Sequence, residues 1–281
     1  MRGFIAMPNH LESVHFISGL PRSGSTLLCA VLRQNPRFQA DITSPVAMLC
    51  GVVHQQIGGT GEFAVHFDEA RCAQMLRGLF DIYYAHVPAG TVVFDTNRTW
   101  TSKAALLGTL YPRSRIICCV RDIGWILDSL ERLRVKHPLK LSTLFTRQTG
   151  ESIYTRVDSL MNSETGLIGA AWSALREAWY SDAAQRLIVV PYDALVREPD
   201  KTLRSLYQKL DEPYFEHDFK NVVYEARQYD EARGMPGLHT VRREVAYIER
   251  QPVIPPDLFA KYGKTHFWAS AGLNTRGVTI L

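Results

Sequence analysis

Short apolar runs alternate with helix-like patterns along most of this 281-residue chain. The runs that predict strands are residues 13–18, 38–43, 91–95, 115–120 and 186–190. Because these runs show little alternation between apolar and polar residues, both faces of each strand should be covered, which is typical of a parallel sheet. The helical patterns between them supply the crossovers that such a sheet requires. The sequence therefore predicts a single doubly wound α/β domain over residues 1–281, with a central parallel sheet flanked by helices.

Apolar residues at helical spacing predict these crossovers. The predicted helices are residues 24–34, 45–56, 68–87, 101–111, 122–135, 170–183 and 199–210. Asp68, at the start of the third of them, is a residue type that caps helix N-termini. Residues 136–165 and 225–265 are rich in polar residues, Pro or Gly, so we expect them to form lids or excursions over the site. Ligands of such sheets bind beyond the carboxyl ends of the strands, where functional residues are expected to gather.

Charge and cysteine content argue against several kinds of partner. The net charge of +4 and the pI of 8.8 are mildly basic, unlike the dense basic face of a nucleic-acid-binding protein. The apolar runs fall far short of the roughly 20 residues that a membrane span requires, and residues 1–16 lack the apolar core of a signal peptide. The five cysteines form no CxxC pair, and the nine histidines show no metal-ligand spacing. We therefore expect a cytoplasmic protein that binds no nucleic acid, membrane or metal.

The segment GLPRSGSTLL, residues 19–28, joins the first predicted strand to the first predicted helix. Backbone N–H groups and the dipole at a helix start favour an anion, and Gly24 lets the backbone approach a ligand closely. Three hydroxyl side chains add donors: Ser23, Ser25 and Thr26. The glycine spacing matches the phosphate loop of nucleotide hydrolases, but Ser25 stands in the place of its lysine. The loop therefore predicts a phosphate-type site in which Arg22 supplies the positive charge.

Two further motifs follow in the chain. CVRDIGWILDS, residues 119–129, ends a predicted strand at Arg121 and places Ser129 eight positions later. RLIVVPYDALVREPDKTLRSLYQKLDEPY, residues 186–214, contains a strand, Tyr192 and a long helix. With the loop, these motifs resemble the sulfotransferase superfamily, whose sulfuryl donor is 3′-phosphoadenylyl sulfate (PAPS). The chain is most similar to bacterial sulfotransferases related to the tyrosylprotein branch.

The resemblance implies a P-loop-like fold and a metal-independent transfer of a sulfuryl group from PAPS to a hydroxyl acceptor, releasing 3′,5′-ADP. The acceptor would be a protein tyrosine or a phenolic or other small-molecule hydroxyl. In the family the loop holds the 5′-phosphosulfate, Arg121 and Ser129 match the pair that grips the 3′-phosphate, and Tyr192 falls near the adenine. Residues 237–262 resemble a segment that folds back over the nucleotide. The implied cofactor contacts are Arg22, Ser23, Gly24, Ser25, Thr26, Arg121, Ser129, Tyr192, His239, Thr240 and Arg250.

Two carboxylates are alternative candidates for the catalytic base. The acceptor hydroxyl needs a general base within hydrogen-bond reach. The tyrosylprotein branch carries a glutamate near the position of Thr43, and Asp41 is the nearest carboxylate in this chain. Another branch places its basic residue at the end of the next strand, where Asp95 is the candidate. Arg98 or Lys103 then stands for a lysine found in that neighbourhood, and Arg22 is the catalytic cation of the loop.

The acceptor and the reaction class leave alternatives. Residues 44–53 are apolar, so an apolar or aromatic acceptor is as compatible with the sequence as an acidic peptide. Aromatic candidates to line its pocket are Trp100, Trp125, Tyr154 and Trp172. A nucleotide kinase that has lost its loop lysine, or a catalytically silent nucleotide-binding module, are the two alternative functions. Magnesium-dependent ATP turnover would support the kinase, and nucleotide binding without sulfate transfer would support the silent module.

Overall fold

The computed structural model describes residues 11, 13–59, 61–137, 139, 152–263 and 265–281. Within these residues it contains a six-stranded sheet with the order β2-β3-β1-β4-β5-β6, in which every pair of neighbours is parallel. The strands are β1 (Ser13–Gly19), β2 (Phe38–Ala40), β3 (Val92–Thr96), β4 (Ile116–Val120), β5 (Leu187–Pro191) and β6 (Thr279–Ile280). The predicted parallel α/β fold is confirmed, and β6 is an additional short strand at one edge.

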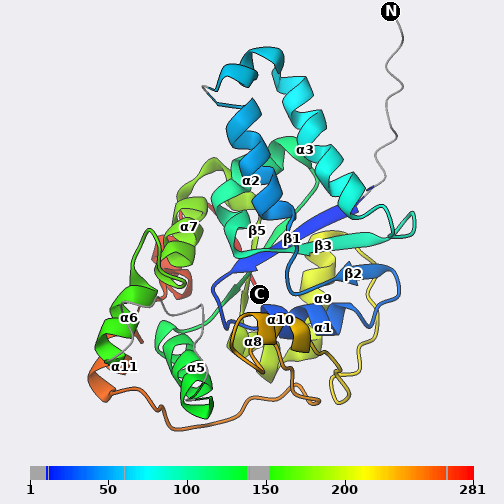
Figure 1. The fold of residues 1–281 in the computed structure, drawn as a ribbon. Helices are drawn as coiled ribbons and strands as arrows, with labels where there is room; N and C mark the ends of the chain where they lie inside the picture. Colours follow the sequence, from blue (N-terminus) through cyan, green and yellow to red (C-terminus); the bar gives the residue numbers. More distant parts are fainter. Residues whose placement is uncertain (1–10, 12, 60, 138, 140–151, 264) are drawn as a thin grey trace, which may run out of the picture.

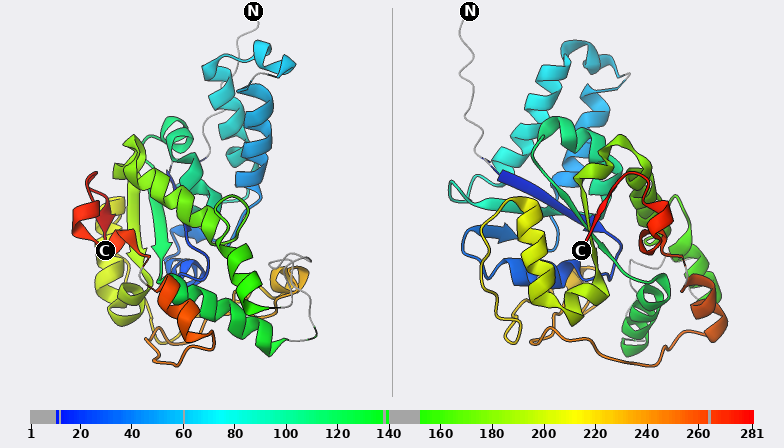
Figure 2. Two further views of the ribbon diagram at one scale, coloured as in Figure 1. Left: turned by 90° about the vertical axis from the view of Figure 1, so that its left-hand side faces the viewer. Right: turned by 180° about the vertical axis from the view of Figure 1, so that it is seen from behind.

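Helices connect successive strands (Figures 1 and 2). The α-helices of the described residues are α1 (Ser25–Leu32), α2 (Val46–Ile57), α3 (Glu69–Tyr83), α4 (Ala104–Leu110), α5 (Ile123–Lys136), α6 (Ile153–Met161), α7 (Gly169–Tyr180), α8 (Tyr192–Arg197), α9 (Pro199–Leu210), α10 (Arg227–Ala232) and α11 (Pro256–Tyr262). Asp68 caps α3 as predicted, because its side chain accepts a hydrogen bond from the backbone N–H of Arg71. The predicted helix 101–111 divides into a 3₁₀ segment, Arg98–Lys103, and α4.

The sheet separates two hydrophobic layers, as the uninterrupted apolar runs predict. Phe16 belongs to the layer that contains residues of α2, α3, α4, α5 and α7, while its neighbour Ile17 belongs to the layer with α1 and α9. Both side chains are fully buried. Successive residues of a strand point to opposite faces, so a strand covered on both sides needs apolar residues along most of its length.

Strand β2 is shorter than the predicted run 38–43 because the chain leaves the sheet edge after Ala40. The carboxylate of Asp41 accepts a hydrogen bond from the Gln39 side chain and pairs with Arg33 on the surface. The α2–α3 hairpin projects from one end of the molecule in Figures 1 and 2.

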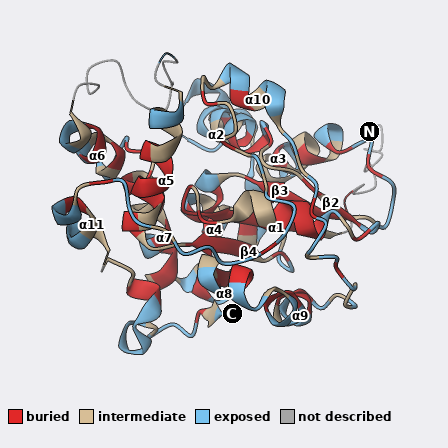
Figure 3. Cartoon of the chain, turned by 90° about the horizontal axis from the view of Figure 1, so that it is seen from below, coloured by how far each residue is buried: buried red, intermediate tan, exposed pale blue. Residues whose placement is uncertain are grey.

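The two segments expected to form lids or excursions, residues 136–165 and 225–265, are described to different extents. Residues 138 and 140–151 of the first segment lie outside the described residues, and α6 forms much of the remainder. In the second, a long extended stretch links α10 to α11 and crosses the molecule in the view from below (Figure 3). None of the helices in the described parts is long and apolar enough to cross a membrane.

Candidate active site

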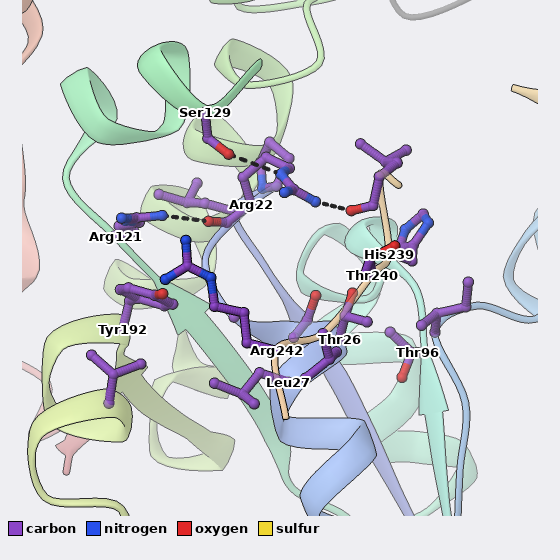
Figure 4. A pocket seen from close by; sticks show the side chains of 18 of the residues that line it. Arg22, Thr26, Leu27, Thr96, Arg121, Ser129, Tyr192, His239, Thr240 and Arg242 are labelled. Carbon is purple, nitrogen blue, oxygen red and sulfur yellow. Dashed lines mark hydrogen bonds between the residues drawn. The ribbon is translucent and has the colours of Figure 1, made fainter. Parts of the chain in front are cut away.

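A cavity of about 360 Å³ lies where the strands end (Figure 4). Its wall includes Leu20 after β1, Asn97 after β3, Arg121 after β4 and Tyr192 after β5. Residues 238–242 and several residues up to 250 form another part of the wall. The cavity therefore lies at the carboxyl ends of parallel strands, where folds of this class bind their ligands.

The loop between β1 and α1 is shaped by two glycines in left-handed conformations. Gly19 has φ +100° and passes directly against the backbone of Cys119 in β4, whose carbonyl accepts a hydrogen bond from Leu20 N–H over 2.8 Å. Gly24 has φ +95°, and a Cβ there would lie 3.0 Å from a ring carbon of Tyr192. Helix α1 begins at Ser25, so the N–H groups of its first turn are available to an anion.

Arg22 joins three segments of the chain at this loop. Its Nε donates to Ser129 Oγ of α5 over 3.2 Å, and its Nη1 donates to the carbonyl of Leu238. Arg22 itself has φ +57°, an uncommon conformation for a residue other than glycine. Burial, followed by the nearby charge of Arg121, lowers the pKa of Arg22 to about 10. An anion in the cavity would relieve this repulsion between guanidinium groups.

Arg121 has a buried donor that the protein does not use. Its Cζ lies 4.0 Å from the centroid of the Tyr192 ring, and its Nη1 donates weakly to the carbonyl of Arg22 over 3.5 Å. Its Nε is buried, and no hydrogen-bond partner for it exists in the described part of the chain. Burial lowers the pKa of Arg121, and Arg250 adds to that effect. Buried donors are normally paired, so this geometry suits an anionic ligand in the cavity, which Ser129 also lines.

Asp128 fastens the C-terminal segment over the cavity. This carboxylate is fully buried in α5 and lies 2.8 Å from Arg250 Nη2. Its other oxygen accepts a hydrogen bond from the backbone N–H of Val253 over 2.7 Å. Sequence reasoning did not select Asp128. The available signal was an acidic residue among the apolar positions of a helix, directly before Ser129.

His239 and Asp230 form a second polar pair at the cavity. His239 Nδ1 lies 2.5 Å from Asp230 Oδ1, and the backbone N–H of His239 donates to Oδ2 over 2.9 Å. Burial lowers the pKa of His239, the contact with Asp230 opposes that shift, and Arg22 and Arg98 lower the pKa further. Asp230 was not selected from the sequence, because nothing in the local pattern distinguishes it from a surface aspartate of a short helix.

The two carboxylates predicted as alternative bases lie elsewhere. Among the described residues that line the cavity, neither Asp41 nor Asp95 is found. Asp41 is about half exposed and pairs with Arg33 at 2.8 Å. Asp95 is fully buried and accepts hydrogen bonds from Ser44 and Tyr84 at 2.6 Å and from Trp100 Nε1 at 2.7 Å. Both carboxylates are thus engaged with the protein away from the cavity.

The other predicted residues divide between the cavity and the surrounding structure. Those that line it are Arg22, Gly24, Ser25, Thr26, Arg98, Arg121, Ser129, Tyr192, His239, Thr240 and Arg250. The Ser23 hydroxyl is turned inward and donates to the Pro21 carbonyl. The aromatic candidates Trp100, Trp125, Tyr154 and Trp172 do not contribute to its wall. Tyr229, Arg233 and Arg242 are among the lining residues that the sequence did not indicate.

A family model and a relative of known name both match this chain. A family model described as "Sulfotransferase family" matches residues 15–216. Protein-tyrosine sulfotransferase 1 of Danio rerio is 24% identical over 208 residues, which are 71% of this chain and 53% of that protein. The chain therefore spans about half the length of this relative.

Solved structures of low sequence identity also match much of the chain. The sulfotransferase domain from the curacin biosynthetic pathway has 16% identity and a TM-score of 0.48, covering 73% of this chain and 76% of that one. A sulfotransferase from Alicyclobacillus acidocaldarius has 17% identity and a TM-score of 0.47, covering 81% of this chain and 90% of that one. The family model alone matches well over half of the residues, with all three sequence motifs inside it, and the chain belongs to the sulfotransferase family.

Proposed function

We propose that this chain transfers a sulfuryl group from PAPS to a hydroxyl acceptor and releases 3′,5′-ADP. The observation that carries the proposal is the buried Nε of Arg121, which has no hydrogen-bond partner among the described residues. It lies in the wall of a cavity that is also lined by the loop before α1. One anion site would be formed by the N–H groups at the start of α1, and a second by Arg121 with Ser129. PAPS carries anionic groups at both its 5′ and 3′ positions, so the two sites suit the two ends of one ligand.

Different residues of the cavity would bind the 5′-phosphosulfate, the leaving phosphate and the adenine. Thr26 and the backbone N–H groups of the first turn of α1 would hold the 5′-phosphosulfate. Arg22 would face the charge that develops on the leaving phosphate, which is how a preorganised cation assists group transfer. Tyr192 lies under Arg121 and would present its ring to the adenine. When bound, PAPS supplies the sulfuryl group and its leaving phosphate.

The acceptor would enter beside the loop, on the side of the cavity formed by Ile42, Thr43, Thr96, Asn97 and Arg98. These residues combine apolar, hydroxyl and cationic side chains, which suits a phenolic hydroxyl on a larger molecule. The Danio rerio relative is by its name a protein-tyrosine sulfotransferase, so a tyrosine peptide and small phenols are the acceptors to test first. Transfer from sulfur-labelled PAPS to a panel of phenols, sugars and tyrosine peptides measures this activity. Nucleotide binding without transfer to any of them would favour the silent module.

Replacement of Arg121 by alanine is expected to weaken 3′,5′-ADP binding by on the order of 10- to 100-fold, because charge-assisted hydrogen bonds to the 3′-phosphate are lost. Calorimetric titration with 3′,5′-ADP and with 5′-AMP, which lacks the 3′-phosphate, isolates this contact. The variant should bind 5′-AMP nearly as well as the unmodified protein does. The preference of the unmodified protein for 3′,5′-ADP should therefore disappear in Arg121→Ala.

Arg113→Ala is the matched control for this experiment. Arg113 is exposed and precedes β4, whereas Arg121 follows the same strand, so both variants remove one positive charge. The control should bind 3′,5′-ADP as the unmodified protein does. Absence of 3′,5′-ADP binding by the unmodified protein, together with magnesium-dependent ATP turnover, would contradict the proposal and favour the kinase.

A further inference from the structure

The pair formed by His239 and Asp230 has the geometry of an oriented proton acceptor. Asp230 is only 2% exposed, and both of its oxygens accept hydrogen bonds from His239, one from the ring and one from the backbone. The carboxylate therefore fixes the orientation of the imidazole and places the ring proton on Nδ1. Nε2 is then the nitrogen that can take up a proton.

His239 lies on the side of the cavity where the acceptor is proposed to enter. The preceding residue, Leu238, accepts the hydrogen bond from Arg22, so the segment is tied to the anion loop, as we call residues 19–28. In Figure 4 the His239 side chain lies on the same side as Thr96, across the cavity from Arg121 and Tyr192. Those two residues are the proposed nucleotide contacts, so His239 faces the remaining space.

We propose that His239 is the general base that removes the proton from the acceptor hydroxyl, with Asp230 as the residue that positions it. This inference rests on the proposed sulfotransferase function. As the acceptor oxygen bonds to sulfur, the bond between sulfur and the phosphate oxygen of PAPS breaks, and its electron pair leaves with 3′,5′-ADP. The hydroxyl proton passes to Nε2 of His239. The resulting imidazolium is stabilised by the Asp230 carboxylate, as in other histidine–aspartate pairs.

The groups around His239 keep its imidazole neutral near pH 7. From α10, Asp230 raises the pKa of His239, and the Tyr229 ring packs at 5.3 Å between centroids. Burial is the largest influence and lowers the pKa, and Arg22 and Arg98 lower it further. A pKa below the ordinary histidine value of about 6.5 leaves most of the protein in the proton-accepting form at pH 7.

His239→Gln should separate this role from a structural one when two phenols are compared. Glutamine retains polar contacts but cannot take up the proton. With 4-methylphenol, whose pKa is about 10 like that of tyrosine, kcat should fall about 10²- to 10⁴-fold. With 4-nitrophenol at a pH at which this phenol is already ionised, the variant should stay within a few fold of the unmodified protein. Because the His239 side chain lies across the cavity from Arg121 and Tyr192, we assign it to the acceptor and no longer to the nucleotide. Affinity for 3′,5′-ADP should therefore be unchanged, which also reports that the variant is folded.

His266→Gln supplies a matched histidine control. His266 Nδ1 lies 3.6 Å from Asp122 Oδ2, and His266 does not line the cavity. Any change of kcat in this variant should therefore be the same for both phenols. Equal losses of His239→Gln on the two phenols, with 3′,5′-ADP binding intact, would overturn the assignment of the base. Failure of the unmodified protein to bind 3′,5′-ADP would instead remove the proposed function on which the assignment rests.

The pH dependence of the unmodified protein tests the base without any substitution. The value of kcat/KM for 4-methylphenol should fall tenfold per pH unit below the pKa of His239, and that limb should lie below pH 6.5. A titration of the His239 ring by NMR in the free protein should give the same pKa. In Asp230→Asn the pKa should be lower still, because the carboxylate that favours the charged ring is gone. Activity that stays level through the pKa that NMR gives for the His239 ring would exclude His239 as the base.

Discussion

Asp95→Ala is expected to lower the free energy of unfolding by about 3–5 kcal/mol. The substitution leaves three buried donors without their acceptor: Ser44 Oγ, Tyr84 Oη and Trp100 Nε1. Burial raises the pKa of Asp95, and these three hydrogen bonds oppose that rise, so the carboxylate is the centre of a buried network. Urea unfolding followed by tryptophan fluorescence measures the loss.

Asp41→Ala is the natural comparison, because the sequence offers the same chemistry at both positions. Asp41 forms a surface pair with Arg33 in which both side chains are about half exposed. Such pairs contribute about 0.2–1 kcal/mol, so this variant should be nearly as stable as the unmodified protein. Sulfate transfer should also survive in Asp41→Ala. A stable Asp95→Ala variant that has lost transfer would show that Asp95 acts in catalysis and that its network is not the main reason for its burial.

Of the substitutions that add one methyl group to the anion loop, Gly19→Ala should lower the free energy of unfolding most. The new Cβ would lie 2.6 Å from the backbone nitrogen of Cys119 and closer still to its carbonyl oxygen. Because these atoms belong to the central strand β4, they cannot move without breaking the pairing of β1 with β4. The φ of +100° adds strain for any residue with a side chain. We expect a loss above about 4 kcal/mol, visible as a low unfolding midpoint and lost 3′,5′-ADP binding.

Gly90→Ala isolates the conformational part of that cost. Gly90 has φ +79°, but a Cβ there would meet nothing within 4 Å. The left-handed conformation alone should cost about 1–2 kcal/mol. A comparable loss in both variants would mean that the contact between Gly19 and β4 contributes little to stability.

Local sequence patterns predicted most of the sheet. Five apolar runs without alternation predicted buried parallel strands, and β1, β3, β4 and β5 follow them closely. The short edge strand β6 was missed because Thr279–Ile280 has too few residues to form a pattern. Helices α8 and α10 were missed for the same reason, since each has only six residues.

The phosphate-type loop and the pair Arg121–Ser129 could be found in the sequence because each lies within one strand–loop–helix unit. Residues at a strand end and in the next helix are close in the chain, and they are also close in the folded structure. Arg22, Thr26, Arg121 and Ser129 accordingly line one cavity.

The choice of base could not be read from the same patterns. Asp41 and Asp95 are the carboxylates that the family resemblance suggests as bases, Asp41 as the nearest one to Thr43. Tertiary contacts turn Asp41 to the surface and bury Asp95 under Tyr84 and Trp100. His239 and Asp230 lie more than two hundred residues after the loop that they face. Their contact depends on how the segment after α10 folds back, tied down through Leu238 to Arg22 and through Arg250 to Asp128. The parallel sheet and the turn of the loop before α1 can be read from the sequence alone, because both follow from local periodicity and turn geometry. Which titratable groups reach the cavity depends on burial and long-range pairing, and these are properties of the folded chain.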